Sequence, residues 1–301
     1  MKTRTLGLIL ILFGIPALVF SQDYAFKVLA NKGNNEVKNG STWQPLKTGA
    51  SLKVGDELKV SENAYLALVH LGSGRPLELK EPKVYDVASL SKKMETGGTT
   101  SVVSKYADFI LTNSAEGEKN KLSATGAVRR DVAGGVSVAL PEEHQSIFGQ
   151  TVPLRWNSPV QGPFVVTVRN MFDELLAQYE TPEKYMEIDL SDPKFGEGPI
   201  LIQVAPKDDP TLACSARFVQ HVESAKKQEV QNALTEAGAF ITEETAVSKL
   251  YLAGFYETHG LVIDAIAAYE DAIKLAPEVT DYVESYEDFL LRHGIRVKVT
   301  N

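Results

Sequence analysis

The sequence predicts a multidomain protein in which two all-β domains are followed by an α-helical hairpin. Over residues 22–95, short apolar runs are broken by turn residues, which is typical of small antiparallel sheets. Over residues 136–220, seven strand-like runs follow one another at near-regular spacing, separated by Pro, Gly, Asn and Asp. Apolar residues recur at helical spacing over residues 221–301, and residues 96–135 are predicted to connect the two β domains.

The first residues, MKTRTLGLILILFGIPALVFSQ, have the layout of a secretory signal peptide. Two cations, Lys2 and Arg4, precede an apolar run from Leu6 to Phe20, which is shorter than the roughly twenty residues that cross a bilayer as a helix. We therefore expect residues 1–21 to be removed on export, and the mature chain to lie in the periplasm or at the envelope of a bacterial cell. Retention of this segment as a membrane anchor is the alternative.

Charge and cysteine content narrow the class of partner. The chain holds 31 Lys and Arg residues and 39 Asp and Glu residues, and loss of two cations with the signal peptide changes its net charge from −8 to −10. This balance argues against a nucleic-acid partner, because phosphate contacts need clustered Lys and Arg. Cys214 is the only cysteine, so no intramolecular disulfide is possible. No second apolar segment approaches membrane length, and we do not expect a transmembrane protein once the signal is cleaved.

Turn signals divide residues 22–95 into strands of four to eight residues. Asn39-Gly40 predicts a two-residue hairpin loop, and Gly72-Ser73-Gly74 predicts the turn of another strand pair. The run AYLALVHL before the second turn alternates in the manner of a strand. One side of this strand would carry Tyr65, Ala67, Val69 and Leu71, and the other Leu66, Leu68 and His70.

The run EVKNGSTWQPLKTGASLKVGDELKVSENAYLALVHLGSGRPLEL resembles the FecR-type periplasmic domain. The pattern is Trp-x-x-Leu, a Gly, Leu-x-x-Gly-Asp, an alternating strand and a glycine turn, at Trp43, Leu46, Gly49, Leu52, Gly55, Asp56, Ala67, Leu68 and Gly72. The resemblance implies an extracytoplasmic sensing or interaction module, although this chain has a signal peptide where the transducing members carry a cytoplasmic segment and a spanning helix. We interpret Gly55-Asp56 as a turn, with Gly55 free to adopt positive φ and Asp56 able to bond its own backbone.

The segment SVVSKYADFIL, residues 101–111, predicts an amphipathic helix. Its apolar residues follow the i, i+1, i+4, i+7, i+8 stripe of one helix face, at Val102, Val103, Tyr106, Phe109 and Ile110. Large apolar residues almost vanish over residues 112–135, so we interpret that stretch as a connector.

The seven strand-like runs of residues 136–220 predict a β-sandwich. Trp156, on the second run, would fill the space between two sheets, and Met186, Ile188 and Leu190 would alternate inward on the fifth. Together with LRW followed by FVVTVRN, this pattern resembles immunoglobulin-like and fibronectin-type modules. Cys214 falls in the last run, where we expect a buried, inert thiol.

The stretch KLYLAGFYETHGLVIDAIAAYEDAIKLAP resembles a tetratricopeptide repeat. The residues at that family's spacings are Leu252, Tyr256, Gly260, Ala265, Tyr269, Ala272 and Pro277, while Lys249 and Ala253 depart from its pattern. Gly260 would end the first helix by adopting the left-handed conformation, and Pro277 would prevent the second from continuing.

A second first-helix pattern follows, with Gly294 thirty-four residues after Gly260, so the chain holds one repeat and a half. Such units normally need about three repeats to bury a continuous core, and we expect this hairpin to pack against a helix at residues 221–237, the β domains or another chain. The ligand-facing positions that the resemblance implies are Leu250, Gly254 and Glu257. Leu250 as an ordinary core residue is the alternative.

No catalytic, cofactor-binding or metal-binding residues are predicted. The five histidines lie outside His-x-x-x-His and His-Glu-x-x-His spacings, and neither a Gly-x-Ser-x-Gly elbow nor a phosphate loop occurs in the sequence. Glu142, Glu143 and His144 are the best candidate metal ligands, but adjacent loop residues rarely point at one ion. The acidic run from Asp189 has Pro193 at the fifth position, where a calcium loop needs an oxygen-bearing side chain.

These features favour an exported, non-enzymatic interaction or scaffold protein of the cell envelope. Its partner would be a protein, and self-association through the C-terminal helices is one form that this partnership would take. The alternative is an extracytoplasmic sensor of FecR type that relays occupancy by a small ligand, glycan or protein to a membrane protein. A hydrolase with an unrecognised site is a third hypothesis.

Overall fold

The computed structural model describes residues 24–95, 105–113 and 134–295. The predicted signal peptide therefore lies outside the described residues, as does most of the predicted connector. Within the described ranges, no helix is long and apolar enough to span a membrane. Among the residues described, strands predominate up to His221 and helices from Ser224 onward, as the sequence predicts.

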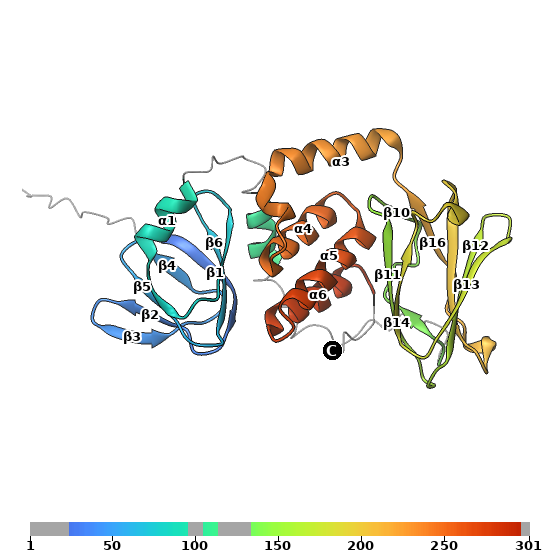
Figure 1. The fold of residues 1–301 in the computed structure, drawn as a ribbon, viewed down its shortest axis with the longest axis horizontal. Coiled ribbons are helices and arrows are strands. Elements are labelled where there is room, and N and C mark those ends of the chain that lie inside the picture. The colour runs from blue at the N-terminus through green and yellow to red at the C-terminus, as the bar shows by residue number, and fades with distance from the viewer. Residues whose placement is uncertain (1–23, 96–104, 114–133, 296–301) are drawn as a thin grey trace, which may run out of the picture.

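Two four-stranded sheets form the N-terminal β unit, residues 24–95 (Figure 1). Their strand orders are β4-β1-β6-β7 and β3-β2-β5-β8. The strands are β1 (Tyr24–Lys32), β2 (Glu36–Asn39), β3 (Thr42–Pro45), β4 (Ser51–Lys53), β5 (Glu57–Val60), β6 (Tyr65–His70), β7 (Pro76–Leu79) and β8 (Lys83–Asp86). Helix α1 (Val87–Glu95) follows β8 and closes the core of this unit with Leu90 and Met94.

The turns of this unit lie close to where the sequence places them. The β2–β3 hairpin has its loop one residue later than predicted, at Gly40-Ser41, because Asn39 pairs with Thr42. The prediction that Gly55 adopts positive φ was wrong, because the φ angle of this residue lies outside the left-handed region. The Asp56 carboxylate closes that turn instead by accepting a hydrogen bond from the Lys53 N–H at 2.8 Å.

Strand β6 is buried on both faces. Leu66 and Leu68 belong to the core of the N-terminal β unit. Tyr65, Ala67 and Val69 belong to the core that this unit shares with the helices. The predicted alternation is therefore confirmed, and both sides of the strand are covered by protein.

A five-stranded sheet (β10-β16-β15-β12-β13) and a three-stranded sheet (β14-β11-β9) form the middle β unit, residues 136–221. The strands are β9 (Ser137–Val138), β10 (Gln145–Ile147), β11 (Thr151–Asn157), β12 (Phe164–Asn170), β13 (Leu175–Thr181), β14 (Tyr185–Asp189), β15 (Ile200–Pro206) and β16 (Arg217–His221). Trp156 is buried with its ring edge-on to Phe164, and Ile188 and Leu190 are also buried, as predicted. Met186 is half-buried and packs against the same core.

Two details of this unit differ from the prediction. The sequence pattern missed β10, a three-residue strand that pairs in parallel with β16 and is too short to show a period. Cys214 is buried as expected, but it precedes β16 rather than lying in it, and its backbone N–H donates to the Val204 carbonyl at 2.9 Å.

The helical unit, residues 224–295, contains the predicted pair of helices and their continuation. Its elements are α3 (Ser224–Ala237), the 3-10 turn η3 (Ala239–Thr242), α4 (Ala246–Thr258), α5 (Val262–Leu275) and α6 (Thr280–Arg292). Gly260 follows α4 with φ 72° and Gly294 follows α6 with φ 69°, so the two related glycines end their helices in the same way.

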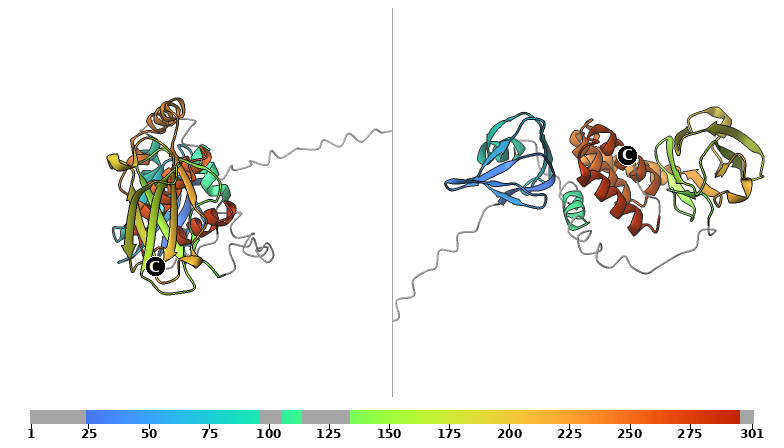
Figure 2. Two further views of the ribbon diagram at one scale, coloured as in Figure 1. Left: turned by 90° about the vertical axis from the view of Figure 1, so that its right-hand side faces the viewer. Right: turned by 90° about the horizontal axis from the view of Figure 1, so that it is seen from below.

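The order of the units in space differs from their order along the chain. The helical unit comes last in sequence but lies between the two β units (Figures 1 and 2). On one side, the Tyr251 hydroxyl donates to the Gly74 carbonyl at 2.8 Å. On the other side, the Arg155 guanidinium bonds the Glu270 carboxylate at 3.1 Å. One continuous apolar core runs from β6 through the helices into the middle β unit, so the two β units cover the helices on both sides.

Candidate functional site

The three predicted ligand-facing residues lie along one side of α4. Leu250 is buried, Gly254 is buried, and the Glu257 side chain is only 8% exposed. We use the name repeat groove for the surface that these residues form with Tyr269 of α5 and with Ser285, Asp288 and Arg292 of α6. Another segment of the same chain covers Leu250 and Gly254.

That segment is the helix formed by residues 105–113, which we call the groove helix. The predicted helix of residues 101–111 is thus confirmed from Lys105 onward, and its first four residues lie outside the described part of the chain. Tyr106, Ala107 and Ile110 are buried, so the predicted apolar stripe faces the protein. The Tyr106 ring meets the Phe255 ring edge-on, with centroids 5.3 Å apart.

Gly254 permits the close approach of the groove helix to α4. A Cβ atom added at this position would lie 3.3 Å from Ile110 Cγ1 and 3.5 Å from Phe109 Cδ1. The first distance is tighter than ordinary van der Waals contact, so the Ile110 side chain would have to shift by a few tenths of an ångström to admit even a methyl group, and a large side chain would meet the groove helix. Glycine inside a helix costs about 1 kcal/mol relative to alanine, and close packing of two helices is the physical reason for it here.

Charged groups occupy one end of the repeat groove. The Glu257 carboxylate accepts hydrogen bonds from Arg292 Nη2 at 2.9 Å and Nε at 3.2 Å, and lies 3.1 Å from His293 Nε2. Burial raises the pKa of Glu257, but the hydrogen bonds from His293 and Arg292 outweigh burial and hold this pKa below its usual range. The carboxylate therefore ties α4 to the end of α6.

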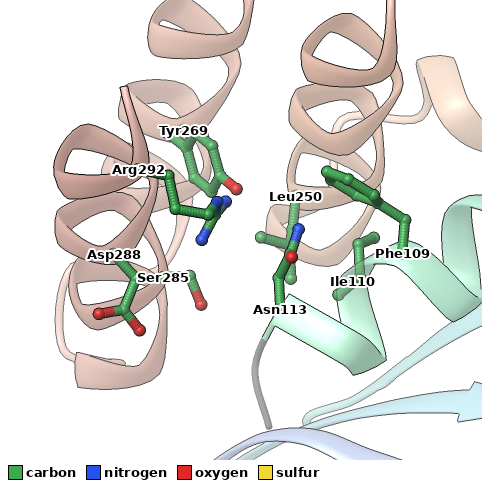
Figure 3. Close-up of a pocket in the computed structure, with 8 residues that line it drawn as sticks. All are labelled: Phe109, Ile110, Asn113, Leu250, Tyr269, Ser285, Asp288 and Arg292. Atoms are coloured by element: carbon green, nitrogen blue, oxygen red, sulfur yellow. The ribbon is translucent and has the colours of Figure 1, made fainter. Parts of the chain in front are cut away.

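A small cavity lies between the groove helix and α6 (Figure 3). Its volume is about 20 Å³, which is room for a single water molecule. Asn113 of the groove helix and Leu250 of α4 line one side, and Ser285, Asp288 and Arg292 of α6 line the other. The groove helix thus leaves polar groups of α6 uncovered.

A second, larger hollow lies between the N-terminal β unit and the turn from α5 to α6. Its volume is about 660 Å³, and it is open on one side. Lys32 and Tyr65 line it on the β side, and Glu278 and Val279 line it on the helical side. An ion pair between Lys32 and Glu278 joins the two units at this hollow. Hollows of this size between domains are frequent ligand sites.

The candidate metal ligands do not converge. The His144 ring packs at a tilt against the Phe218 ring, with centroids 4.1 Å apart, and the Glu142 carboxylate approaches the Arg217 guanidinium instead. Among the described residues, no group of three His, Cys, Asp or Glu side chains is placed to hold an ion.

Sequence reasoning missed a buried histidine with two serine partners. His70 Nδ1 lies 2.8 Å from Ser73 Oγ and its Nε2 lies 2.8 Å from Ser91 Oγ, and burial lowers its pKa. Both ring nitrogens are engaged and the ring is 3% exposed, so the histidine ties the β6–β7 turn to α1 rather than facing a substrate. His70 and Ser73 are three residues apart, but Ser91 lies 21 residues after His70, and no local motif signals that second contact.

Neither a protein-family model nor a curated protein matches this chain. The contacts among the groove helix and helices α4 to α6 are therefore the basis for proposing a function. Of the predicted site residues, Leu250 and Gly254 both border the groove helix, whereas Glu257 lies in the charged cluster at the end of α6.

Proposed function

We propose that this protein is an exported, non-enzymatic interaction or scaffold protein of the bacterial cell envelope, and that the repeat groove is its partner-binding surface. In this proposal the N-terminal β unit is a FecR-like domain, the middle unit is an immunoglobulin-like sandwich, and α4 to α6 are a repeat and a half of tetratricopeptide type. The signal-peptide layout of residues 1–21 and the net negative charge favour a protein partner outside the cytoplasm.

One observation carries this proposal. Leu250 and Gly254, which the sequence pattern identifies as ligand-facing, border a helix that is not part of the repeat. The groove therefore has the shape and apolar lining needed to accept an amphipathic helix, which is a recurring mode of protein recognition. The β units on both sides hold the helices in place, so a short repeat needs no further repeats to keep this surface.

A photo-crosslinking amino acid at Ser285 tests the proposal in cells that make the protein. Ser285 lines the cavity beside the groove helix. A discrete envelope protein should crosslink from this position, and an excess of a peptide with the sequence of residues 101–113 should abolish the product. The matched control places the same probe at Gln178, an exposed residue of β13. The same products from both positions, or none from Ser285, would count against the proposal.

The hollow beside Tyr65 favours a second candidate, an extracytoplasmic ligand sensor of FecR type. A ligand in a hollow of about 660 Å³ would contact the N-terminal β unit and the helices at once, and so couple occupancy to their arrangement. Glu62→Trp would fill part of the hollow without entering the core, since Glu62 lines the hollow and is exposed. A sensor should lose its transcriptional output in this variant. If deletion of the whole protein leaves transcription of every envelope-stress and uptake operon unchanged, the sensor hypothesis is wrong.

A further inference from the structure

The surface proposed to bind a partner is occupied by the chain itself. The groove helix lies against α4 so closely that Ile110 Cγ1 is 3.3 Å from where a side chain at Gly254 would begin. Leu250 is 4% exposed beside it. An outside partner therefore cannot reach these two residues while the groove helix is in place.

The groove helix also shows which pattern of side chains the repeat groove accepts. Its contacts come from Tyr106, Phe109 and Ile110, which stand at i, i+3 and i+4 on one helix face. Tyr106 packs against Phe255, while Phe109 and Ile110 pack over Gly254. The groove thus fits one aromatic residue followed, one turn later, by two large apolar residues.

The fit is incomplete at the C-terminal end of the groove helix. Asn113 lies there beside the small cavity, opposite the polar side chains of Ser285, Asp288 and Arg292 (Figure 3). The Arg292 guanidinium already bonds Glu257, and the Asp288 carboxylate lines the same cavity, so this end of the groove suits a neutral polar side chain such as an amide rather than a carboxylate. The cavity beside Asn113 has room for one water molecule.

We infer that the partner of the repeat groove is an amphipathic helix with an aromatic residue at i and large apolar residues at i+3 and i+4. In the absence of this partner, residues 105–113 of the same chain occupy the groove. This inference rests on the proposed function. A partner binds by displacing the groove helix, so its apparent affinity is lowered by an intramolecular competitor. A helix of this length has little stability of its own in water, so its order depends on the groove.

Displacement is tested with a fluorescent peptide of residues 101–113 and the full chain carrying Ile110→Asp. The new carboxylate would be buried against Gly254, so it should release the groove helix and open the groove. The peptide should then bind the variant at least tenfold more tightly than it binds the wild type, because a tethered competitor acts at an effective concentration on the order of millimolar. Thr112→Asp is the matched control, since it adds the same charge at an exposed position of the same helix.

Equal binding to all three proteins, or binding to none, overturns the inference. A peptide that itself carries the Ile110→Asp change should not bind. If Ile110→Asp fails to fold, Ile110→Ala takes its place and should show the same order of affinities with a smaller difference. A wild-type dimer that Ile110→Asp converts to a monomer would also overturn it, because the groove helix would then be exchanged between two copies.

Amide hydrogen exchange of the wild type gives an independent measurement that needs no variant. An occupant held in cis should open without the rest of the fold, so the amides of residues 105–113 should exchange faster than those of α4 and α5. Equal protection would identify the segment as a permanent part of the core. If these results hold and the crosslink from Ser285 fails, the groove binds helices but the scaffold function is wrong.

Discussion

Asp264 joins the helical unit to the middle β unit, and its titration should control the stability of that junction. In the first turn of α5, its carboxylate accepts hydrogen bonds from the Phe148 N–H at 2.9 Å and the Gly149 N–H at 2.7 Å. The side chain is 5% exposed. Burial raises the pKa of Asp264 from 3.8 to about 6, and the two backbone donors offset only part of this rise.

The direction of the pH effect follows from this raised pKa. Because the folded pKa of Asp264 exceeds the unfolded one, its contribution to stability is complete below about pH 4 and is lost as the pH rises through about 6. A difference of about two pKa units corresponds to about 3 kcal/mol in the free energy of unfolding. Asp264→Asn cannot ionise, so its free energy of unfolding relative to the wild type should rise by up to this amount between about pH 4 and pH 7. Its amide can accept only one of the two backbone hydrogen bonds, which adds a penalty that does not vary with pH.

Urea unfolding of both proteins across this pH range measures the difference. In a Trp43→Phe background, fluorescence of the buried Trp156 reports on the middle β unit, and far-ultraviolet circular dichroism reports on the helices. Asp271→Asn is the control, because it removes the same charge from a half-exposed position of the same helix. A difference between Asp264→Asn and the wild type that stays constant within about 0.5 kcal/mol, or that moves the opposite way, refutes the reasoning.

Three further predictions concern the helices. Glu257→Gln should lower the free energy of unfolding by about 1–3 kcal/mol near neutral pH; because the pKa of Glu257 is depressed, urea titrations should show the wild-type advantage disappearing as the pH falls through that pKa. Gly254→Leu should expel the groove helix, so hydrogen exchange of its amides should accelerate while α5 stays protected. Tyr282→Phe should cost about 1 kcal/mol in thermal unfolding, because the Tyr65 hydroxyl loses its buried partner at 2.6 Å.

Each of these predictions has its own contrary result. Glu287→Gln, at a half-exposed site of α6, is the control for Glu257→Gln, and an equal loss of stability in both would show that the contacts of Glu257 with Arg292 and His293 add no specific stability. Unchanged exchange in Gly254→Leu would mean that the groove adapts to the larger residue. A Tyr282→Phe variant as stable as the wild type would mean that water replaces the missing hydroxyl.

The elements were predictable where a short-range pattern encodes them. Gly260 and Gly294 follow helices with positive φ, a conformation that costs glycine little, and both glycines are visible in the sequence pattern. Period-two alternation located β6 and assigned its faces. The three-residue strand β10 has no period to detect, and only its pairing with β16 defines it.

The arrangement of the units was not predictable, because the residues that set it lie far apart in the chain. Asp264 and Phe148 carry no motif that links them, nor do Arg155 and Glu270. The position of the groove helix was missed for the same reason, although Gly254 held a signal. A glycine in the middle of a helical pattern indicates a close approach by another element, and that element proved to be the predicted amphipathic helix.

Strand β6 serves two cores at once, and this limits how the protein can be cut or recombined. If the helical unit were deleted, Tyr65, Ala67 and Val69 would become an apolar stripe on the surface, although the sheet beneath them would be intact. An isolated N-terminal β unit should therefore be prone to aggregate. Alternate residues of this strand contact different neighbours, so different parts of the protein constrain their substitution in evolution. The N-terminal β unit and the helical unit must therefore change together and cannot be exchanged as independent modules.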